Sequence, residues 1–217
     1  MGEPLTILNL PALEVAALQQ DPYPHVIIPD LLRSHAHESI VQDFPSIDFR
    51  GSLPLSELRY GKSFGQLIAE IEGPAFREAI ENKFAIDLSE RPVFTTVRGR
   101  TTDRDGHIHT DTKSKLITVL LYFNPGWAAE GGRLRVLRNG ENLDDYVSEI
   151  PPSLGSCFIF RVTDNCWHGH KPFIGVRRAI QLNYLTDEAA LKQHQTRHNI
   201  TAKWKNFKRR FGRTDSY

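Results

Sequence analysis

Three side chains that can bind a metal ion occur in the order histidine, carboxylate, histidine. His109 and Asp111 are separated by one residue, and His168 follows 57 residues after Asp111. Alternate side chains of a β-strand point to the same face, so a strand here would place His109 and Asp111 together. Two imidazoles and one carboxylate are typical of non-haem iron(II) sites with open positions for further ligands. Such a set also accepts other divalent metals, so these residues alone do not identify iron.

Two further histidines share the predicted faces of the metal ligands. His107 lies two residues before His109, and His170 lies two residues after His168. Each could be a neighbour of the ligands, a substrate contact or an exposed polar residue, and His107 is a rival ligand. A lone His-x-Asp triplet is weak support for a metal site, because a surface histidine is its usual explanation. The interpretation therefore depends on the residues downstream.

Residues 177–184 predict a strand with one polar and one apolar face. A guanidinium can hold a carboxylate through two parallel hydrogen bonds, and it stays charged when partly buried. Arg177 is therefore the candidate for binding the carboxylate of a dicarboxylate cosubstrate. Arg178 is the alternative if the register slips by one residue, and both arginines could instead lie at a rim. The polar face is Arg177, Ala179, Gln181 and Asn183, and the apolar face, expected against helices, is Arg178, Ile180, Leu182 and Tyr184.

Short apolar runs separated by turn residues fill the chain from Pro92 onward. Residues 115–123 are almost wholly apolar, which is typical of a strand covered on both faces. Many short strands with regular turn signals predict a sandwich or a barrel. The expected strands are 93–97, 107–111, 115–123, 133–137, 156–160 and 177–184.

The N-terminal part predicts helices that pack on the outside of this β core. A short strand is expected at 25–28, and helices are expected from Asp30, as N-cap, to about 43, then at 63–71 and 74–84. We expect one domain over 1–217, mainly β with flanking α. Its parts are a mainly helical support (1–91), a catalytic core (92–187) and a basic extension (188–217).

The extension predicts a basic amphipathic helix. Aromatic and apolar side chains recur at helical spacing, with lysines and arginines between them. The simpler interpretation is a terminal helix that packs its aromatic face on the domain; the alternative is contact with an acidic partner or a membrane surface. The apolar stripe is Ile200, Trp204, Phe207 and Phe211.

The composition is that of an ordinary globular protein. The 217 residues include 40% hydrophobic and 24% charged residues, and the net charge is +1. No overall field selects nucleic acid or membrane as a partner. The N-terminal residues lack the pattern of a signal peptide, and Cys157 and Cys166 lack a paired spacing, so a cytoplasmic location with free thiols is expected.

Several segments together resemble the iron(II)- and 2-oxoglutarate-dependent oxygenases of the prolyl-hydroxylase-like group. The resemblance covers about residues 92–187, and its motifs come in the family's order. It implies a double-stranded β-helix, a jelly-roll or cupin-like core, with helices on the outside. The matching segments are His109-Thr110-Asp111, Leu121-Tyr122-Phe123-Asn124 with Trp127, Gly131-Gly132-Arg133-Leu134, and Trp167-His168 followed by Pro172, Gly175 and Arg177.

The resemblance also implies roles for residues of the site. His109, Asp111 and His168 would ligate iron(II), and Arg177 would bind a carboxylate of 2-oxoglutarate. Tyr122 would hydrogen-bond the same carboxylate, and Thr118 would line the pocket. O2 would be the second cosubstrate, and ascorbate is expected to support turnover.

The implied activity is hydroxylation of an aliphatic C–H with release of succinate and CO2. A prolyl or other peptide substrate is favoured, and a free amino acid, a sugar or another small metabolite is the alternative. A non-catalytic metal-binding jelly roll and a cupin-type hydrolase or isomerase are the competing classes. Two departures affect the pocket: Asn183 stands where many relatives carry tryptophan, and the loop 100–106 is highly charged.

Overall fold

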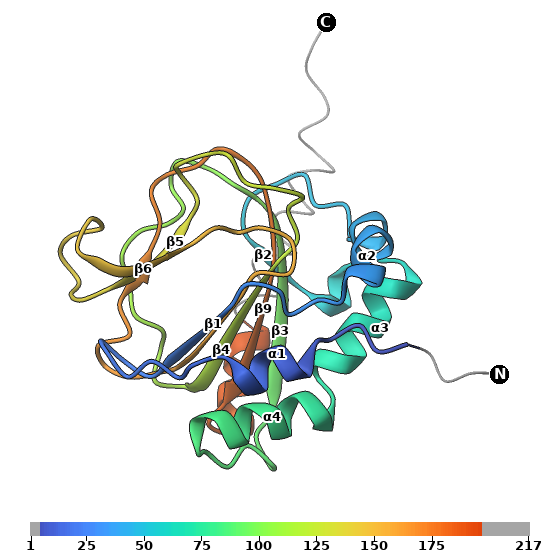
Figure 1. Cartoon of the computed structure of the whole chain (residues 1–217), viewed down its shortest axis with the longest axis horizontal. Coiled ribbons are helices and arrows are strands. Elements are labelled where there is room, and N and C mark those ends of the chain that lie inside the picture. The colour runs from blue at the N-terminus through green and yellow to red at the C-terminus, as the bar shows by residue number, and fades with distance from the viewer. Residues whose placement is uncertain (1–4, 197–217) are drawn as a thin grey trace, which may run out of the picture.

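Two antiparallel β-sheets and a group of helices make up the structure, a computed structural model that describes residues 5–196 (Figure 1). The large sheet has the strand order β1-β7-β4-β9-β3-β2, and the small sheet has the order β6-β5-β8. The strands of the large sheet are β1 (His25–Ile28), β2 (Ser52–Pro54), β3 (Val93–Thr101), β4 (Lys115–Tyr122), β7 (Cys157–Arg161) and β9 (Gly175–Leu185). Those of the small sheet are β5 (Leu134–Leu137), β6 (Tyr146–Ile150) and β8 (His168–Gly169).

The helices gather on one side of the large sheet (Figure 1). Their apolar faces and the facing side of the sheet form one buried cluster that includes Phe64, Phe76 and Val119. A second, smaller cluster lies on the other side of the sheet and joins it to the small sheet through Val136 and Phe158. These helices are α1 (Leu10–Val15), α2 (His37–Asp43), α3 (Lys62–Ile71) and α4 (Pro74–Phe84), with 3-10 turns at Ser34–Ala36 and Leu55–Glu57. A further helical segment at 188–196 packs separately, with Ala190 in a small cluster with Phe94 and Leu185.

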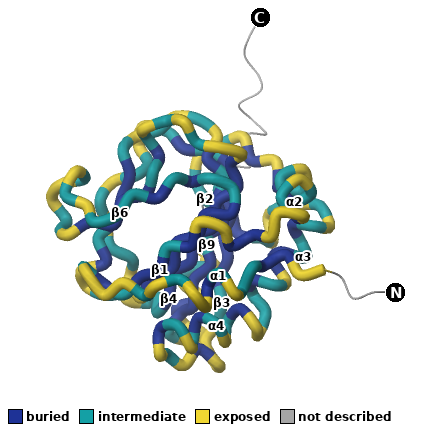
Figure 2. The backbone as a smooth tube through the Cα atoms, viewed as in Figure 1, coloured by how far each residue is buried: buried dark blue, intermediate teal, exposed yellow. Residues whose placement is uncertain are grey.

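Strand β4 lies near the middle of the large sheet because both of its faces are apolar. It pairs with β7 on one side and β9 on the other. Val119 packs toward the helices, whereas Tyr122 belongs to the cluster between the sheets. Figure 2 shows the same pattern, with buried backbone concentrated in the central strands and exposed residues in the outer loops. The expected β core with helices outside is confirmed.

Strand β9 has the two faces that its sequence predicts. Ile180, Leu182 and Tyr184 are buried in the cluster beneath the helices. Arg177 and Gln181 line a cavity on the opposite side. The alternation therefore separates the apolar residues from those that can contact a polar ligand.

The predicted strand at 107–111 is wrong. Residue His109 forms only an isolated antiparallel bridge with His168. Gly106, with a φ of 94°, turns the chain just before this segment, and a turn at 113–114 follows it, which leaves too little extended chain for a strand.

The helix expected from Asp30 begins later, with a 3-10 turn at Ser34 that leads into α2. The backbone before it is used elsewhere: Leu31 N donates to Gly155 O at 2.8 Å, and Leu32 bridges to Leu8. Both leucines are fully buried. Tertiary pairing therefore holds this segment extended and overrides the capping signal.

The N-terminal part contributes more than helices, because β1 and β2 form the two edges of the large sheet. Strands β2, β6 and β8, helix α1 and the helix at 188–196 were not predicted. The proposed helix at Ile200–Phe211 lies outside the described residues. Within residues 5–196, no helix has the length and apolar character needed to cross a membrane.

Candidate active site

His109, Asp111 and His168 converge. Each offers one ligand atom, and the three atoms lie within 4.8 Å of one another. The bridge between the backbones of the two histidines carries this convergence: each N–H donates to the other's carbonyl at 3.0 Å. The two imidazole centroids are 4.3 Å apart. A single pair of backbone hydrogen bonds to β8 thus places His109 beside His168, and the proximity of His109 and Asp111 that we expected from strand alternation occurs without a strand.

The histidines are oriented with one nitrogen available to a metal. His109 Nδ1 lies 2.9 Å from the His107 carbonyl oxygen, and His168 Nδ1 lies 2.8 Å from that of Cys166. A carbonyl oxygen only accepts, so Nδ1 carries the hydrogen and Nε2 keeps its lone pair. Burial and the neighbouring His109 lower the pKa of His168 to about 4. A neutral imidazole is the form that binds metal.

The Asp111 carboxylate is held on both of its oxygens. Lys115 Nζ is 3.1 Å from Oδ1, and the Thr118 hydroxyl donates to Oδ2 at 2.5 Å. Burial acts to raise the pKa of Asp111, but Lys115, His168 and Thr118 together outweigh it and the pKa is lowered. The carboxylate is therefore ionised and fixed in direction. Lys115 was not predicted from the sequence, although its position four residues after Asp111 on a tight turn was the available signal.

Thr118 lies behind the metal ligands. It is fully buried, and its hydroxyl is also 3.1 Å from Asn183 Oδ1. Asn183 in turn accepts from Gln181 Nε2 at 3.3 Å. A line of polar contacts thus runs from the cavity-lining Gln181 to the Asp111 carboxylate. A direct contact of Thr118 with a cosubstrate stays a prediction, since the contact that the structure shows is with Asp111.

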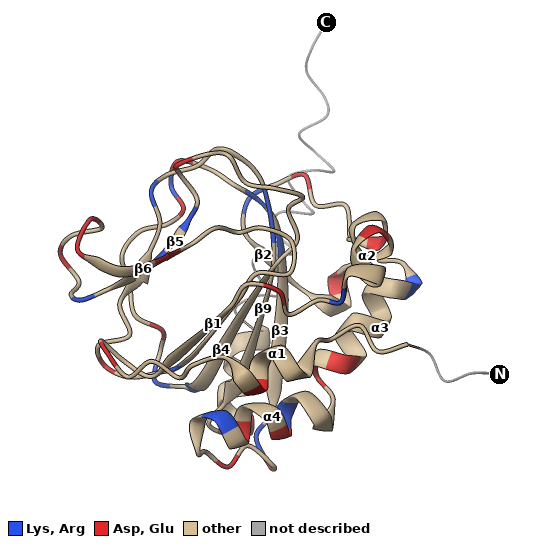
Figure 3. Cartoon of the chain, in the orientation of Figure 1, with Lys and Arg blue, Asp and Glu red and all other residues tan. Residues whose placement is uncertain are grey.

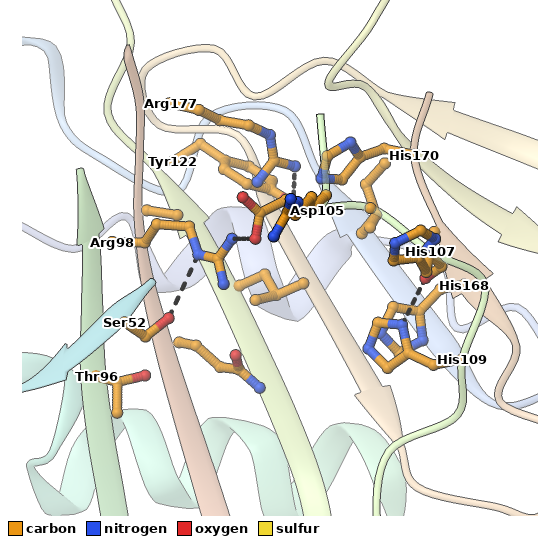
Figure 4. Close-up of a pocket in the computed structure, with 17 residues that line it drawn as sticks. Ser52, Thr96, Arg98, Asp105, His107, His109, Tyr122, His168, His170 and Arg177 are labelled. Atoms are coloured by element: carbon orange, nitrogen blue, oxygen red, sulfur yellow. Dashed lines mark hydrogen bonds and ion pairs between the residues drawn. The ribbon is translucent and has the colours of Figure 1, made fainter. Parts of the chain in front are cut away.

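A cavity of about 300 Å³ opens beside the ligands. His109 and His168 lie on one side of it, and Arg177 and Tyr122 lie on another (Figure 4). This volume is at the lower end of that typical for small-molecule sites. The histidines and Arg177 therefore share one space.

Arg177 is buried and rigidly placed. Its Nε donates to the Gly132 carbonyl at 2.8 Å, its Nη2 lies 3.4 Å from the Tyr122 hydroxyl, and its guanidinium lies 5.0 Å from the Tyr122 ring centroid. Burial lowers its pKa and raises that of Tyr122. At neutral pH the pair is still a cation beside a neutral phenol. Such a pair suits a carboxylate.

Arg178 points the other way. Its guanidinium lies 5.5 Å from the Phe44 ring centroid, on the helical side of the sheet. Its backbone N–H donates to the Asn124 side chain at 2.9 Å. Of the two neighbouring arginines, Arg177 lines the cavity and Arg178 does not.

The two additional histidines also line the cavity. His107 is exposed and lies outside the group of three close ligand atoms. His170 is buried, with its Nδ1 2.8 Å from the Lys171 carbonyl oxygen. Burial and the charge of Arg177 lower the pKa of His170 to about 4. A neutral His170 thus lies in the cavity close to Arg177.

The donor set fits an iron(II) ion. Two imidazoles with free Nε2 atoms and one ionised carboxylate are the ligands of the facial triad described for non-haem iron. A sequence profile of the 2OG-Fe(II) oxygenase superfamily matches residues 98–185, a range that contains all three of these residues and Arg177. The chain is therefore similar to this superfamily through residues 98–185. It is a 2-oxoglutarate-dependent oxygenase, and its cofactors are iron(II) and 2-oxoglutarate, with O2 as cosubstrate.

Solved structures share the fold of this oxygenase. A prolyl-4-hydroxylase from Pseudomonas putida is 14% identical, with a TM-score of 0.54, over 85% of this chain and 94% of that one. A prolyl 4-hydroxylase from Phytophthora capsici is 15% identical, with a TM-score of 0.58, over 84% of this chain and 67% of that one. Iron-bound HygX from Streptomyces hygroscopicus is 13% identical, with a TM-score of 0.51, over 74% of this chain and 81% of that one. No curated protein sequence matches the chain.

The fold of these relatives confirms the expected double-stranded β-helix core. Sequence reasoning missed Arg98, and it identified Asp105 only as part of the charged loop 100–106 that could contact a polar substrate. They form an ion pair of 2.7 Å. The high charge of the loop 100–106 was a signal for Asp105, whereas Arg98 precedes that loop on β3 and carried no local signal.

Proposed function

We propose that this oxygenase hydroxylates an aliphatic C–H of a small molecule or a peptide and converts 2-oxoglutarate to succinate and CO2. His109, Asp111 and His168 hold the iron. The convergence of their ligand atoms within 4.8 Å, beside the cavity that Arg177 lines, is the observation that carries the proposal. Iron with 2-oxoglutarate supplies the oxidising chemistry when bound, and the protein supplies position and exclusion of side reactions.

Arg177 and Tyr122 bind the carboxylate of 2-oxoglutarate that is farther from the metal. The guanidinium is charged and buried, and the bond from its Nε to Gly132 prevents it from rotating away. The Nη groups and the phenol remain to donate to the carboxylate. A charged group that is already removed from water makes a stronger contact than an exposed one.

The polypeptide also fixes the ligands. Backbone carbonyls of His107 and Cys166 select the histidine tautomers, and Thr118 and Lys115 orient the carboxylate. Such contacts behind metal ligands commonly change metal affinity by about 10- to 100-fold. Lys115 would share the Asp111 carboxylate with the metal.

Two substrate classes remain in the proposal. The similar structures from Pseudomonas putida and Phytophthora capsici are both prolyl 4-hydroxylases, which favours a prolyl or other peptide residue. A free amino acid, a sugar or another small metabolite is the alternative, and it fits a cavity of about 300 Å³.

Succinate release tests the activity. The protein is incubated with iron(II), 2-oxoglutarate, ascorbate and pools of peptides or metabolites, and succinate and CO2 are measured. We expect iron-dependent formation of both, stimulated by the pool that holds the substrate. His109→Ala should abolish it, whereas the matched variant His35→Ala, an exposed histidine on the 3-10 turn at Ser34–Ala36, should not. No succinate from any pool would contradict the proposed activity.

A further inference from the structure

A patch of polar side chains lies in the cavity apart from the metal ligands and Arg177. It is formed by three neighbouring strands at the β2 edge of the large sheet. Ser52 on β2 is opposite Arg98 on β3, and Thr96 on β3 is opposite Gln181 on β9. All four residues line the cavity. Figure 4 shows Ser52, Thr96 and Arg98 across the cavity from His109 and His168. We call Ser52, Thr96, Arg98 and Gln181 the Arg98 patch.

The guanidinium of Arg98 is anchored by two hydrogen bonds and has a further donor group, Nη2, that can bind a ligand. Its Nη1 donates to Asp105 Oδ1 at 2.7 Å, and its Nε donates to Ser52 Oγ at 3.4 Å. Its side chain is 27% exposed, and among residues 5–196 no partner occupies its Nη2. An arginine that is anchored through some N–H groups presents the rest to a ligand in a fixed direction.

The Asp105 carboxylate accepts its hydrogen bonds from residues of the protein, which leaves Arg98 rather than Asp105 to contact a ligand. Besides Arg98 it accepts hydrogen bonds from the backbone N–H of Thr102 at 2.8 Å and from the Thr102 hydroxyl at 3.1 Å. These bonds and the Arg98 ion pair lower the pKa of Asp105 against the opposing effect of burial. The carboxylate thus stays ionised, closes the turn before the metal ligands and anchors Arg98.

Positive charge exceeds negative charge around the cavity. Its lining contains the cations Arg98, Arg104 and Arg177, and Asp105 is the only carboxylate among the described lining residues. Arg177 is reserved for 2-oxoglutarate in the proposed function, and Asp105 balances Arg98. Arg104 remains as an exposed cation at the cavity. Figure 3 shows the corresponding concentration of Lys and Arg at the β2–β3 end of the large sheet, whereas α4 carries both signs.

Arg98 also acts on the neighbouring Arg177. The charge of Arg98 acts to lower the pKa of Arg177, in addition to the effect of burial. A second anion, bound beside Arg98 while 2-oxoglutarate occupies Arg177, would offset this repulsion.

We propose that the Arg98 patch binds an oxyanionic group, a carboxylate or a phosphate, of the substrate that is oxidised. This inference rests on the proposed function, because it assigns Arg177 to 2-oxoglutarate and the Arg98 patch to the second substrate. The guanidinium supplies charge, and the hydroxyls of Ser52 and Thr96 and the amide of Gln181 supply hydrogen bonds. Arg104 adds a cation from the loop. The preferred substrates therefore carry a negative charge at a fixed distance from the oxidised carbon.

Binding of small probes tests the patch directly. The protein is loaded with Mn(II) and 2-oxoglutarate so that Arg177 is occupied, and four probes are titrated by calorimetry. The probes are the N-acetylated, C-amidated forms of aspartate, asparagine, phosphoserine and serine. We expect the aspartate or the phosphoserine probe to bind at least about 10-fold more tightly than its neutral counterpart, as a charge-assisted hydrogen bond implies. Which of the two binds distinguishes a carboxylate from a phosphate substrate.

Two substitutions with opposite expected effects on probe binding separate ligand binding from a structural role. Arg98→Gln should weaken binding of the charged probe about 10- to 100-fold. Asp105→Asn keeps the acceptor for the Thr102 N–H but removes the competing charge, so it should tighten binding of the same probe. Arg161→Gln is the matched control, because Arg161 is exposed at the end of β7 outside the cavity lining; it should change nothing.

The outcomes are distinct. Equal binding of charged and neutral probes, or binding that is unchanged in Arg98→Gln, overturns the inference. Weaker binding in both Arg98→Gln and Asp105→Asn assigns the ion pair to loop structure and also overturns it. Failure to load Mn(II) and 2-oxoglutarate contradicts the proposed function instead. In that case the same titrations of the unloaded protein and of Arg98→Gln still decide whether the patch binds an oxyanion.

Discussion

The Thr118 hydroxyl donates a hydrogen bond to Asp111 Oδ2 from strand β4. Asp111 itself lies in a segment without regular structure, so its own backbone does not fix the direction of its side chain. The central strand β4, on which Thr118 is fully buried, therefore positions a ligand that the preceding loop supplies. This relationship makes Thr118 a positioning residue for the metal centre.

Thr118→Val keeps the shape of the side chain and removes the donor. We expect Fe(II) or Mn(II) affinity to fall about 10-fold, the lower part of the range for contacts behind metal ligands, while the KM for 2-oxoglutarate at saturating metal changes little. Metal titration measures the affinity. Thr95→Val is the matched control, because the Thr95 hydroxyl donates at 2.6 Å to a remote carboxylate, Glu72. Equal metal affinity in wild type and Thr118→Val would show that Thr118 does not position the metal ligand.

Arg177→Gln should raise the KM for 2-oxoglutarate by about 100-fold, because a buried carboxylate loses its charged partner. Arg178→Gln tests the neighbouring arginine on the opposite face, over Phe44, and should leave that KM within about twofold. Steady-state succinate formation at varied 2-oxoglutarate measures both values. The reverse pattern would mean that the register of β9 differs by one residue in solution.

Asp111→Ala should abolish both metal binding and succinate formation, since two histidines alone hold iron weakly. Asp87→Ala is the control: Asp87 is an exposed carboxylate that accepts from Ser89 far from the cavity. Metal content after dialysis and succinate yield are measured in parallel. Full activity of Asp111→Ala would exclude Asp111 as a ligand.

His170 should make the metal-free protein sensitive to acid. Its pKa in the folded protein is about 4, against 6.5 for an ordinary histidine, owing to burial and Arg177. Below pH 6.5 the unfolded chain therefore binds a proton that the folded chain resists, and stability falls between pH 6.5 and about 4. The full shift corresponds to about 3 kcal/mol.

His170→Gln should remove part of this loss. Urea unfolding at pH 7 and pH 4.5 gives the change in unfolding free energy for each protein, and the difference between the changes isolates His170. His35→Gln, an exposed histidine, should behave as wild type. An equal loss in His170→Gln and wild type would show that His170 is protonated at its ordinary pKa.

The predictable parts of the site are those that depend on local periodicity. The alternation of β9 is long and regular, so the sequence correctly separates Arg177 and Gln181 from the apolar residues that pack beneath the helices. The same argument was wrong for residues 107–111. There, two hydrogen bonds between the backbones of His109 and His168 bring the ligands together without a strand.

The remaining parts depend on contacts between distant segments. Ser52 contacts Arg98 only because β2 pairs with β3 at the edge of the large sheet. No local sequence pattern predicts the register of that pairing. The ion pair of Arg98 with Asp105 needs both the bend of the loop and the direction of β3. Lys115 was overlooked for a related reason: its contact with Asp111 follows from the turn at 113–114, which lies between Asp111 and the start of β4.

The central claim is that one cavity holds iron at His109, Asp111 and His168 together with 2-oxoglutarate at Arg177. Anaerobic titration of the protein with iron(II) and 2-oxoglutarate tests it most directly, because chelation of iron by a 2-oxo acid produces a visible charge-transfer band. We predict a saturable band in wild type, no band in Asp111→Ala, and a band in Arg177→Gln only at much higher 2-oxoglutarate. Absence of the band in wild type, or an undiminished band in Asp111→Ala, would contradict the claim.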